Sequence, residues 1–322
     1  LLANRSSMTS NVLLTGGFGT LGGRLAALLS GDETINLRLA SREKRVAPSW
    51  APRAETVQVD FDNAGSIKNM LQDVSHVVHL VAMPDFESRA EPELAKLVNT
   101  QYTQRVIDAC APDVRFVYIS TIQVYGGSLK GVVTDKTPTL PTDVYAQTHL
   151  DAEKLVEAAN QQGRIRGVTL RNANGFGAPM SKDAKIWQII TNDLCRQAVE
   201  HKKLVLKSHG QQFRNFIPFS DVVSAINHSL RADFAWTDST TFNLGGAKSI
   251  RVLEMASMVA DRCETTLGFR PQVQTHGEQP STQPESFVYD SSKLNATGFS
   301  PEYQVGDEID HLLKACQRWF GR

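Results

Sequence analysis

The chain has 322 residues, of which 41% are hydrophobic, and its 34 basic residues balance its 34 acidic ones, so its net charge is zero. This length exceeds the usual size of one hydrophobic core and predicts a large domain with an appended lobe. The balanced charge argues against a nucleic-acid partner or an anionic membrane surface, and no apolar run approaches the ~18–20 residues of a membrane span. The cysteines lack paired spacing and are expected to be reduced thiols of a cytoplasmic protein.

The first strong structural signal is the stretch 11–29, NVLLTGGFGTLGGRLAALL. An apolar run of strand length breaks into glycines and resumes as leucines at helical spacing, which predicts a strand, a tight turn and a helix. Gly16 allows the turn, Gly19 lets a pyrophosphate approach the backbone, and Gly22 lets the helix pack closely on the strand. The amides at the helix start then face an anion. A glycine-rich turn without a ligand is the alternative.

The next predicted strand, 36–41, ends where a dinucleotide-binding fold selects its cofactor. An acidic residue there would accept hydrogen bonds from the adenosine ribose of NAD, whereas this chain has Ser41, Arg42 and then Lys44. Cations suit a 2′-phosphate, so these residues favour NADP over NAD. A solvated loop of charged residues is the alternative.

Later segments continue the alternation of strand and helix. Strands are predicted at 56–60, 77–82 and 114–121, and a long helix is predicted at 91–111. This order predicts a parallel sheet with helices on both faces, whose ligands lie at the carboxyl ends of the strands. Asp60 and Asp62, at one such end, are candidates to bind an adenine amine.

Hydroxyl and imidazole groups follow in the middle of the chain. Ser120 and Thr121 end the strand 114–121, where they either face a ligand or simply bond loop amides. A helix predicted at 141–158 carries Tyr145 and His149 four residues apart, so that both side chains lie on one face. No metal site is predicted.

Together these motifs resemble the extended short-chain dehydrogenase/reductase family of nucleotide-sugar epimerases, dehydratases and ketoreductases. The resemblance spans almost the whole chain and rests on TGGFGTLGG, VVHLVA, LVNTQYTQRVIDA, STIQVYG, the Tyr145 helix, LRNANGFGAP, RNFIPFSDVV, FNLGG and YDSSKL. It implies an α/β fold, a doubly wound parallel sheet of Rossmann type with a smaller mixed α/β lobe. The expected division is a dinucleotide-binding domain at 8–174, completed by 216–245, and a substrate-binding lobe at 175–215 and 246–322.

The resemblance also implies roles for individual residues. Tyr145 would be the acid/base that exchanges a proton with the substrate oxygen, Thr121 would bond the same oxygen, and Ser120 would support it. Asn174 and Arg214 match positions that contact the diphosphate of a nucleotide-sugar, although a surface salt bridge is the alternative for Arg214. The implied cofactor contacts are Gly16, Phe18, Gly19, Thr20, Leu21, Gly22, Ser41, Arg42, Asp60, Phe61, Leu80, Val81, Ala82, Asn99, Tyr145 and His149.

Two features depart from the family pattern. The family motif Y-x-x-x-K has a lysine that bonds the nicotinamide ribose and lowers the pKa of the tyrosine, whereas this chain has His149. A neutral histidine supplies little of that electrostatic help, but it can still bond a ribose hydroxyl. The stretch 277–290, GEQPSTQPESFVYD, also lacks the arginine that nucleotide-sugar members carry for the distal phosphate. A substrate without a diphosphate therefore stays an alternative.

The leading expectation is an NAD(P)-dependent oxidoreductase or epimerase acting on a nucleotide-sugar, a 4-epimerase or a 4-ketoreductase. Dehydratases of the family follow the threonine with an Asp-Glu pair, whereas Ile122 and Gln123 follow Thr121 here, which disfavours dehydration. The rival is a dinucleotide-binding sensor or scaffold with little turnover, motivated by His149. The resemblance further implies a homodimer formed through the helices at 91–111 and 145–158.

Overall fold

The structure is a computed structural model that describes residues 9–234, 239–277 and 284–321. The chain forms two compact units. The first comprises Leu1–Gly127, Thr139–Arg171 and Ile226–Phe242, and the second comprises Ser128–Pro138, Asn172–Ala225 and Asn243–Arg322.

A seven-stranded sheet dominates the first unit, in the order β11-β7-β5-β4-β1-β2-β3. Its strands are β1 (Ser10–Thr15), β2 (Ile35–Ser41), β3 (Glu55–Gln58), β4 (His76–His79), β5 (Arg115–Thr121), β7 (Arg166–Asn172) and β11 (Thr241–Leu244). The pairs β1 with β2, β1 with β4, β2 with β3, and β4 with β5 are parallel. The chain reverses its direction of winding between β1 and β4, so this is the doubly wound Rossmann-type sheet expected from the sequence.

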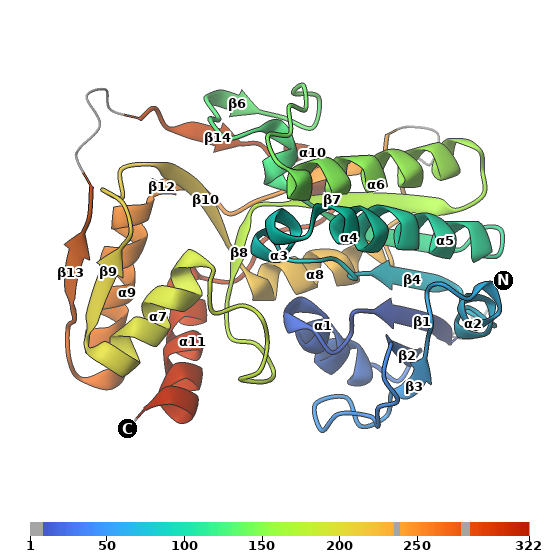
Figure 1. The fold of residues 1–322 in the computed structure, drawn as a ribbon, viewed down its shortest axis with the longest axis horizontal. Coiled ribbons are helices and arrows are strands. Elements are labelled where there is room, and N and C mark those ends of the chain that lie inside the picture. The colour runs from blue at the N-terminus through green and yellow to red at the C-terminus, as the bar shows by residue number, and fades with distance from the viewer. Residues whose placement is uncertain (1–8, 235–238, 278–283, 322) are drawn as a thin grey trace, which may run out of the picture. The chain divides into compact units, whose positions relative to one another are not determined.

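Helices cover this sheet because their apolar residues fall on one stripe. They are α1 (Thr20–Ser30), α2 (Ala64–Met70), α3 (Asp85–Ala90), α4 (Pro92–Ala95), α5 (Tyr102–Ala109) and α6 (Val144–Gln161). Buried side chains of α2, α5 and α6 join those of the central strands in one core, with Ile67, Val106 and Val156 among them. The helices α5 and α6 lie side by side (Figure 1), which places the Tyr145 helix beside the sheet.

The predicted helix 91–111 is divided into three parts. A π-helical segment, Lys96–Gln101, separates α4 from α5. Within it, Asn99 is buried, and its side chain accepts a hydrogen bond from the Met83 amide (2.7 Å) and donates one to the Thr148 hydroxyl (3.0 Å). Such π-segments are uncommon and occur often at functional sites. Here the segment orients the Asn99 side chain so that it contacts both the loop after β4, at Met83, and the Tyr145 helix, at Thr148.

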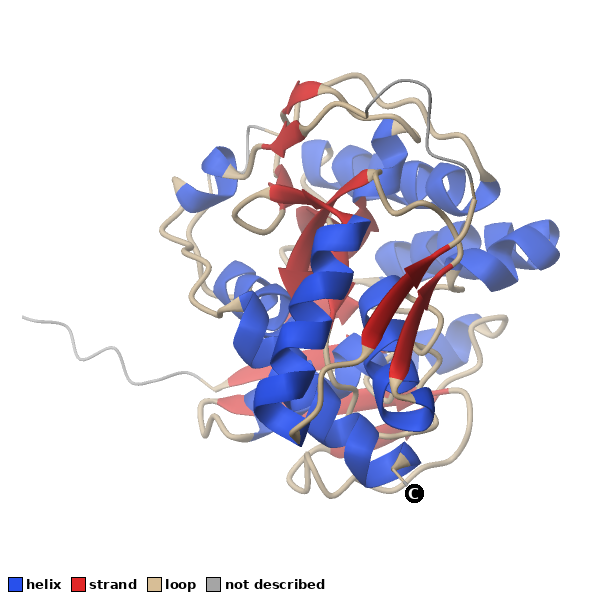
Figure 2. Cartoon of the chain, turned by 90° about the vertical axis from the view of Figure 1, so that its left-hand side faces the viewer, coloured by secondary structure: helices blue, strands red, loops and turns tan. Residues whose placement is uncertain are grey.

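The second unit contains three small sheets and a cluster of helices. The strands are β6 (Gly131–Val133), β8 (Asn174–Phe176), β9 (Lys203–Leu206), β10 (Phe213–Pro218), β12 (Ser249–Arg251), β13 (Gln272–Thr275) and β14 (Phe287–Tyr289). The helices are α7 (Ile190–His201), α9 (Val252–Leu267), α10 (Ser292–Asn295) and α11 (Val305–Phe320), and α8 (Phe219–Ser229) runs across the boundary between the units. Figure 2 shows β9 and β13 paired as a two-stranded ribbon.

The boundary between the units differs from the predicted one, because residues 128–138, 172–174, 216–225 and 243–245, predicted in the cofactor domain, belong to the second unit. Within 216–225, β10 pairs with β8 and β12 of the second unit. The strand predicted at 241–245 does join the large sheet, as β11 at its edge. The first and last residues of the predicted domains, Met8 and Arg322, lie outside the described residues.

All four cysteines are described and free of disulfides. Three of them, Cys195, Cys263 and Cys316, belong to the apolar core of the second unit, and Cys110 is half-buried in the first. Burial raises the pKa of Cys110 and Cys316 to about 12 and that of Cys263 to about 11. None of the described helices is both long enough and apolar enough to cross a bilayer.

Candidate active site

The carboxyl ends of the parallel strands bring the predicted cofactor residues to one edge of the sheet. Thr15 at the end of β1 lies opposite Ala40 of β2 on one side and His79 of β4 on the other. The chain leaves the sheet directly after these residues, into the glycine turn, the Ser41 loop and the segment that starts at Leu80. Ligands of doubly wound sheets bind at this edge.

The glycine turn has the backbone geometry predicted for it. Gly16 has a φ of +74°, and a Cβ atom there would lie 2.9 Å from the Leu80 carbonyl. A Cβ atom on Gly22 would lie 2.2 Å from the Gly16 oxygen, so only glycine lets α1 start this close to the turn. No side chain caps α1 at Gly19, which leaves its first amides available to an anion. The turn therefore fits a pyrophosphate, and contact through Phe18, Thr20 and Leu21 stays a prediction.

The loop after β2 presents several cations. The Arg42 guanidinium is exposed, and the Ser41 hydroxyl accepts a hydrogen bond from the Glu43 amide (3.2 Å). Glu43 pairs with Arg45 at 2.8 Å, and the Arg45 guanidinium lies 5.0 Å from the centre of the Phe18 ring. An acidic residue is thus present in this loop, but an arginine neutralises it.

The two aspartates after β3 differ in their partners. Asp62 accepts hydrogen bonds from Arg105 and from the Tyr102 hydroxyl (3.1 Å), and these bonds lower its pKa. The Asp60 side chain is exposed, and its carboxylate accepts a bond from the Asp62 amide (2.9 Å). Phe61 is buried against Tyr102, with ring centres 5.0 Å apart. Of the two carboxylates, Asp60 is the one that remains available for a ligand.

The end of β4 is held by a buried histidine and by Asn99. Thr103 donates its hydroxyl hydrogen to the Asn99 carbonyl (2.7 Å). The Thr103 oxygen can therefore only accept from His79 Nε2–H (3.1 Å). The other ring nitrogen, Nδ1, then accepts a bond from the Thr15 hydroxyl (2.9 Å). Burial lowers the pKa of His79 to about 3, so the ring is neutral. Both ends of the Asn99 amide are occupied by protein groups. Asn99 therefore shapes the Leu80, Val81 and Ala82 segment, while its predicted contact with the cofactor is untested.

Tyr145 is half-buried, and its hydroxyl lies close enough to Thr121 for that side chain to affect its pKa. Burial is the main cause that raises the pKa of Tyr145 to about 12, Asp85 adds to it, and the bond from Thr121 opposes it. Ser120 is buried, and its hydroxyl has no hydrogen-bond partner among the described residues. The structure thus brings together Tyr145, Thr121 and Ser120, with one hydroxyl unpaired.

His149 lies one helical turn after Tyr145, with the two ring centres 4.5 Å apart. Its ring is 4% exposed, its Nδ1 lies 2.8 Å from the Tyr118 hydroxyl, and its Nε2 has no partner among the described residues. Burial lowers the pKa of His149 to about 4, so the imidazole is neutral at physiological pH. His149 therefore lacks the positive charge of the family lysine, but it offers one unpaired polar atom.

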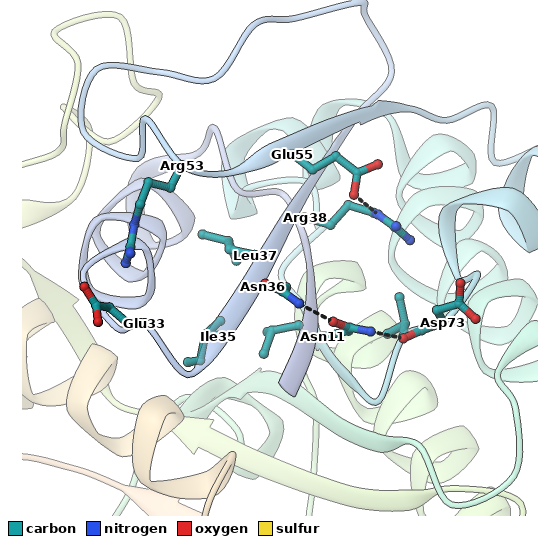
Figure 3. Close-up of a pocket in the computed structure, with 11 residues that line it drawn as sticks. Asn11, Glu33, Ile35, Asn36, Leu37, Arg38, Arg53, Glu55 and Asp73 are labelled. Carbon is teal, nitrogen blue, oxygen red and sulfur yellow. Dashed lines mark hydrogen bonds and ion pairs between the residues drawn. The ribbon is translucent and has the colours of Figure 1, made fainter. Parts of the chain in front are cut away.

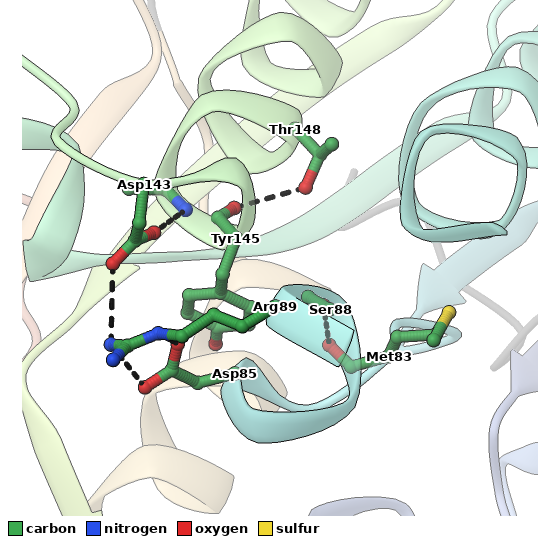
Figure 4. A network of polar contacts seen from close by, with 8 residues as sticks. Met83, Asp85, Ser88, Arg89, Asp143, Tyr145 and Thr148 are labelled. Carbon is green, nitrogen blue, oxygen red and sulfur yellow. Dashed lines mark hydrogen bonds and ion pairs between the residues drawn. The ribbon is translucent and has the colours of Figure 1, made fainter. Parts of the chain in front are cut away.

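An ion-pair network joins α3 to the start of the Tyr145 helix (Figure 4). Arg89 bonds both carboxylate oxygens of Asp85, at 2.8 and 2.9 Å, and reaches Asp143 at 3.4 Å. Asp143 is the N-cap of α6 and accepts a bond from the Ala146 amide at 2.9 Å. This network fixes the first turn of the helix, on which Tyr145 is carried.

Asp143→Ala is expected to lower the free energy of unfolding by about 1 kcal/mol, because a helix amide loses its capping acceptor. Asp143→Asn is the matched control, since an asparagine keeps the capping oxygen and loses only the exposed ion pair with Arg89. Urea unfolding of the three proteins measures both effects. Equal stability of the alanine variant and the unmodified protein would contradict the capping role.

The two predicted substrate residues lie in the second unit, on neighbouring strands. Asn174 of β8 is opposite Phe216 of β10, and Arg214 precedes Phe216 by two residues. The Asn174 amide donates to the Asn215 carbonyl at 2.9 Å, whereas the Arg214 side chain is exposed. Lys293 bonds Asp135 at 2.9 Å and lies in the short helix α10. In the stretch 277–290, where the family arginine for the distal phosphate is missing, residues 278–283 lie outside the described residues.

A pocket of about 450 Å³ lies at the opposite end of the large sheet (Figure 3). Its lining includes Asn11 and Asn36 at the starts of β1 and β2, and Arg38, which pairs with Glu55 at 2.9 Å. No residue predicted for the cofactor lines it. It is therefore separate from the candidate active site.

Two residues near Tyr145 were not predicted from the sequence. Tyr118 shares a strand face with Ser120, and this period-two spacing in the stretch 114–121 was the available signal. Asp85 directly follows Met83-Pro84, and only the fold shows that its carboxylate acts on the pKa of Tyr145. Both lie within the first unit.

Comparison with known proteins identifies the family. Residues 12–245 match the model of the NAD dependent epimerase/dehydratase family, so the chain belongs to this family of NAD-dependent enzymes. The Low-salt glycan biosynthesis protein Agl12 of Haloferax volcanii is 24% identical over 96% of this chain and 98% of its own length. UDP-glucose 4-epimerase of Lactobacillus helveticus is 24% identical over 96% of each chain.

Solved structures show the same fold. UDP-glucuronic acid 4-epimerase from Bacillus cereus, in complex with UDP-glucuronic acid and NAD, superposes with a TM-score of 0.79. The superposition covers 96% of this chain and 99% of that one at 21% identity. This likeness shows that the fold of almost the full length of the chain, and not only its Rossmann-type sheet, occurs in a solved structure.

Proposed function

We propose that the protein is an NAD(P)-dependent oxidoreductase or epimerase that acts on a sugar hydroxyl or carbonyl of a nucleotide-sugar, as a 4-epimerase or a 4-ketoreductase. The observation that carries the proposal is the Tyr145 hydroxyl, which lies beside Thr121 on a ring packed against His149, in a chain whose glycine turn fits a pyrophosphate. UDP-sugar 4-epimerases among the related proteins support the choice of substrate class.

The bound cofactor would supply the hydride acceptor or donor. Tyr145 would exchange the proton at the substrate oxygen, Thr121 would bond the same oxygen, and Ser120 would support it. Because the pKa of Tyr145 is raised to about 12, this hydroxyl is protonated at neutral pH and ready to donate a proton during carbonyl reduction. The oxidative half of an epimerisation needs the opposite state, the tyrosinate, which the buried site disfavours.

Arg214→Ala is the experiment for the substrate class. If Arg214 binds the diphosphate, its removal is expected to weaken a UDP-sugar by roughly 1.5–3 kcal/mol, the range for a hydrogen bond to a charged group. Calorimetric titration of UDP-glucose and UDP-glucuronic acid into cofactor-loaded protein measures this, with Lys207→Ala, another exposed cation of the second unit, as control. No binding of any nucleotide-sugar would favour a substrate without a diphosphate.

The protein is expected to bind NADP(H) more tightly than NAD(H), because the exposed Arg42 and the Ser41 hydroxyl lie where a 2′-phosphate is recognised. Arg42→Ala is then expected to weaken NADP(H) and to leave NAD(H) nearly unchanged. Fluorescence titration of both cofactors tests this preference. The related Bacillus cereus structure contains NAD, so equal or tighter binding of NAD here would make Arg42 an ordinary solvated residue.

The second candidate is a dinucleotide-binding sensor or scaffold with little turnover. The neutral His149 favours it, because the tyrosinate has no cation of the family type beside it. Binding of dinucleotide with no change in any nucleotide-sugar tried, judged by ¹H NMR, which distinguishes epimers of equal mass, would support this candidate over the enzyme. The proposal also includes a cytoplasmic homodimer, formed through the helices at 91–111 and 145–158, which sedimentation would test.

A further inference from the structure

The unusual feature of the candidate site is the environment of His149. The ring lies between two tyrosines, with its centre 5.9 Å from that of Tyr118 and 4.5 Å from that of Tyr145. One ring nitrogen is bonded to the Tyr118 hydroxyl at 2.8 Å, and the other is buried without a partner among the described residues. Buried polar atoms are rarely left unpaired, so the unpaired nitrogen indicates a missing ligand atom.

The hydrogen bond between Tyr118 and His149 has two possible directions. In the first, the Tyr118 hydroxyl donates to Nδ1, and the single ring hydrogen of the neutral imidazole is on Nε2. In the second, Nδ1–H donates to the tyrosine oxygen, and Nε2 carries a lone pair. The two directions differ in whether His149 offers a ligand a donor or an acceptor.

Counting unpaired groups separates these alternatives. The first direction leaves only the Nε2–H of His149 without a partner. The second leaves the Nε2 lone pair and also the hydroxyl hydrogen of Tyr118, which is 1% exposed and has no other bond among the described residues. Because each buried unpaired polar group costs on the order of 1–3 kcal/mol, the first direction is favoured.

We propose that Tyr118 is a positioning residue that fixes His149 in its Nε2–H form, so that His149 presents a hydrogen-bond donor to a hydroxyl oxygen of the nicotinamide ribose. This proposal rests on the dinucleotide binding described under the proposed function. The neutral imidazole thus replaces the donor of the family lysine, while the charge of that lysine is not replaced. Tyr118 is suited to this role because it is buried against the imidazole, and its hydroxyl has no other hydrogen-bond partner among the described residues.

The tautomer can be observed without any substrate or cofactor. Two-bond ¹⁵N–¹H correlation spectra of protein labelled with ¹⁵N-histidine are expected to show His149 protonated on Nε2. Tyr118→Phe removes the donor and is expected to give the Nδ1–H form or a mixture of both. Tyr125→Phe is the matched control: it also removes a buried hydroxyl, one bonded to Arg171 at 2.8 Å, and it is expected to leave the His149 signals unchanged.

Cofactor affinity supplies the second measurement. Tyr118→Phe is expected to weaken dinucleotide binding about three- to tenfold, the effect of one misdirected hydrogen bond. In a His149→Ala background the same substitution is expected to change affinity by less than twofold, because no imidazole is left to orient. Melting temperatures of all variants show whether each one is folded.

Different results separate this proposal from the proposed function. An Nδ1–H signal in the unmodified protein, or an equal effect of Tyr118→Phe in both backgrounds, would overturn the role of Tyr118. If the tautomer and the coupled loss of affinity are both found but no nucleotide-sugar is converted, the positioning role holds and the proposed enzyme activity fails.

Discussion

Tyr145→Phe is expected to lower turnover by a factor of about 10²–10⁴, the usual contribution of a positioned acid/base group. The substitution removes only the hydroxyl beside Thr121, and the ring still fills its place against His149. Steady-state rates with a nucleotide-sugar that the protein converts measure the loss. Dinucleotide affinity is expected to change little, because the hydroxyl acts on the substrate oxygen.

Thr121→Val serves as the comparison for this variant, since it removes the second hydroxyl proposed to bond the substrate oxygen and leaves the tyrosine hydroxyl present. Its rate is expected to lie between those of Tyr145→Phe and the unmodified protein. A Tyr145→Phe protein that retains a large part of the original rate would show that another group transfers the proton.

His149→Lys is expected to move the pH dependence of substrate oxidation to lower pH by about two units. Oxidation needs the tyrosinate, so its rate rises as the pH approaches the pKa of Tyr145, which the structure places near 12. An ammonium about 5 Å from the tyrosinate stabilises it by roughly 3 kcal/mol at an effective dielectric constant of 20, or about two pKa units. His149 supplies no such charge, because its own pKa is lowered to about 4.

Rates of the oxidative half-reaction between pH 6 and pH 10 test this expectation, with His149→Gln as the neutral control that can still donate a hydrogen bond. The glutamine variant is expected to keep the profile of the unmodified protein. An unmoved profile in an active His149→Lys protein would show that charge at this position does not govern Tyr145.

The fold was largely predictable because its signals are local. The glycine turn, the short apolar strands and the Tyr145 helix each depend on residues close together in the sequence, and the family match and the sheet order confirm the Rossmann-type assignment. The pairing of β10 was not predictable in this way. Its apolar stretch suits any sheet, and only tertiary contacts assign it to β8 and β12.

The residues of the candidate site were predictable from the sequence, but their charges and hydrogen-bond partners were not. The helical spacing of Tyr145 and His149 predicts a shared face, and their rings lie in contact. The charge of His149, the partner on its Nδ1 and the availability of Asp60 rather than Asp62 depend on burial and on residues distant in sequence. Periodicity carries no information on these properties.

The cysteines allow local unfolding of the chain to be measured by alkylation of their thiols. Alkylating reagents attack thiolates, and burial keeps Cys110, Cys263 and Cys316 protonated at any ordinary pH. A reagent in solution therefore modifies these sulfurs slowly, at a rate set by the local opening that exposes each thiol to water and lowers its pKa. Cys110 belongs to the first unit, and Cys263 and Cys316 belong to the second. The order in which they are modified therefore shows which unit opens more readily by local unfolding.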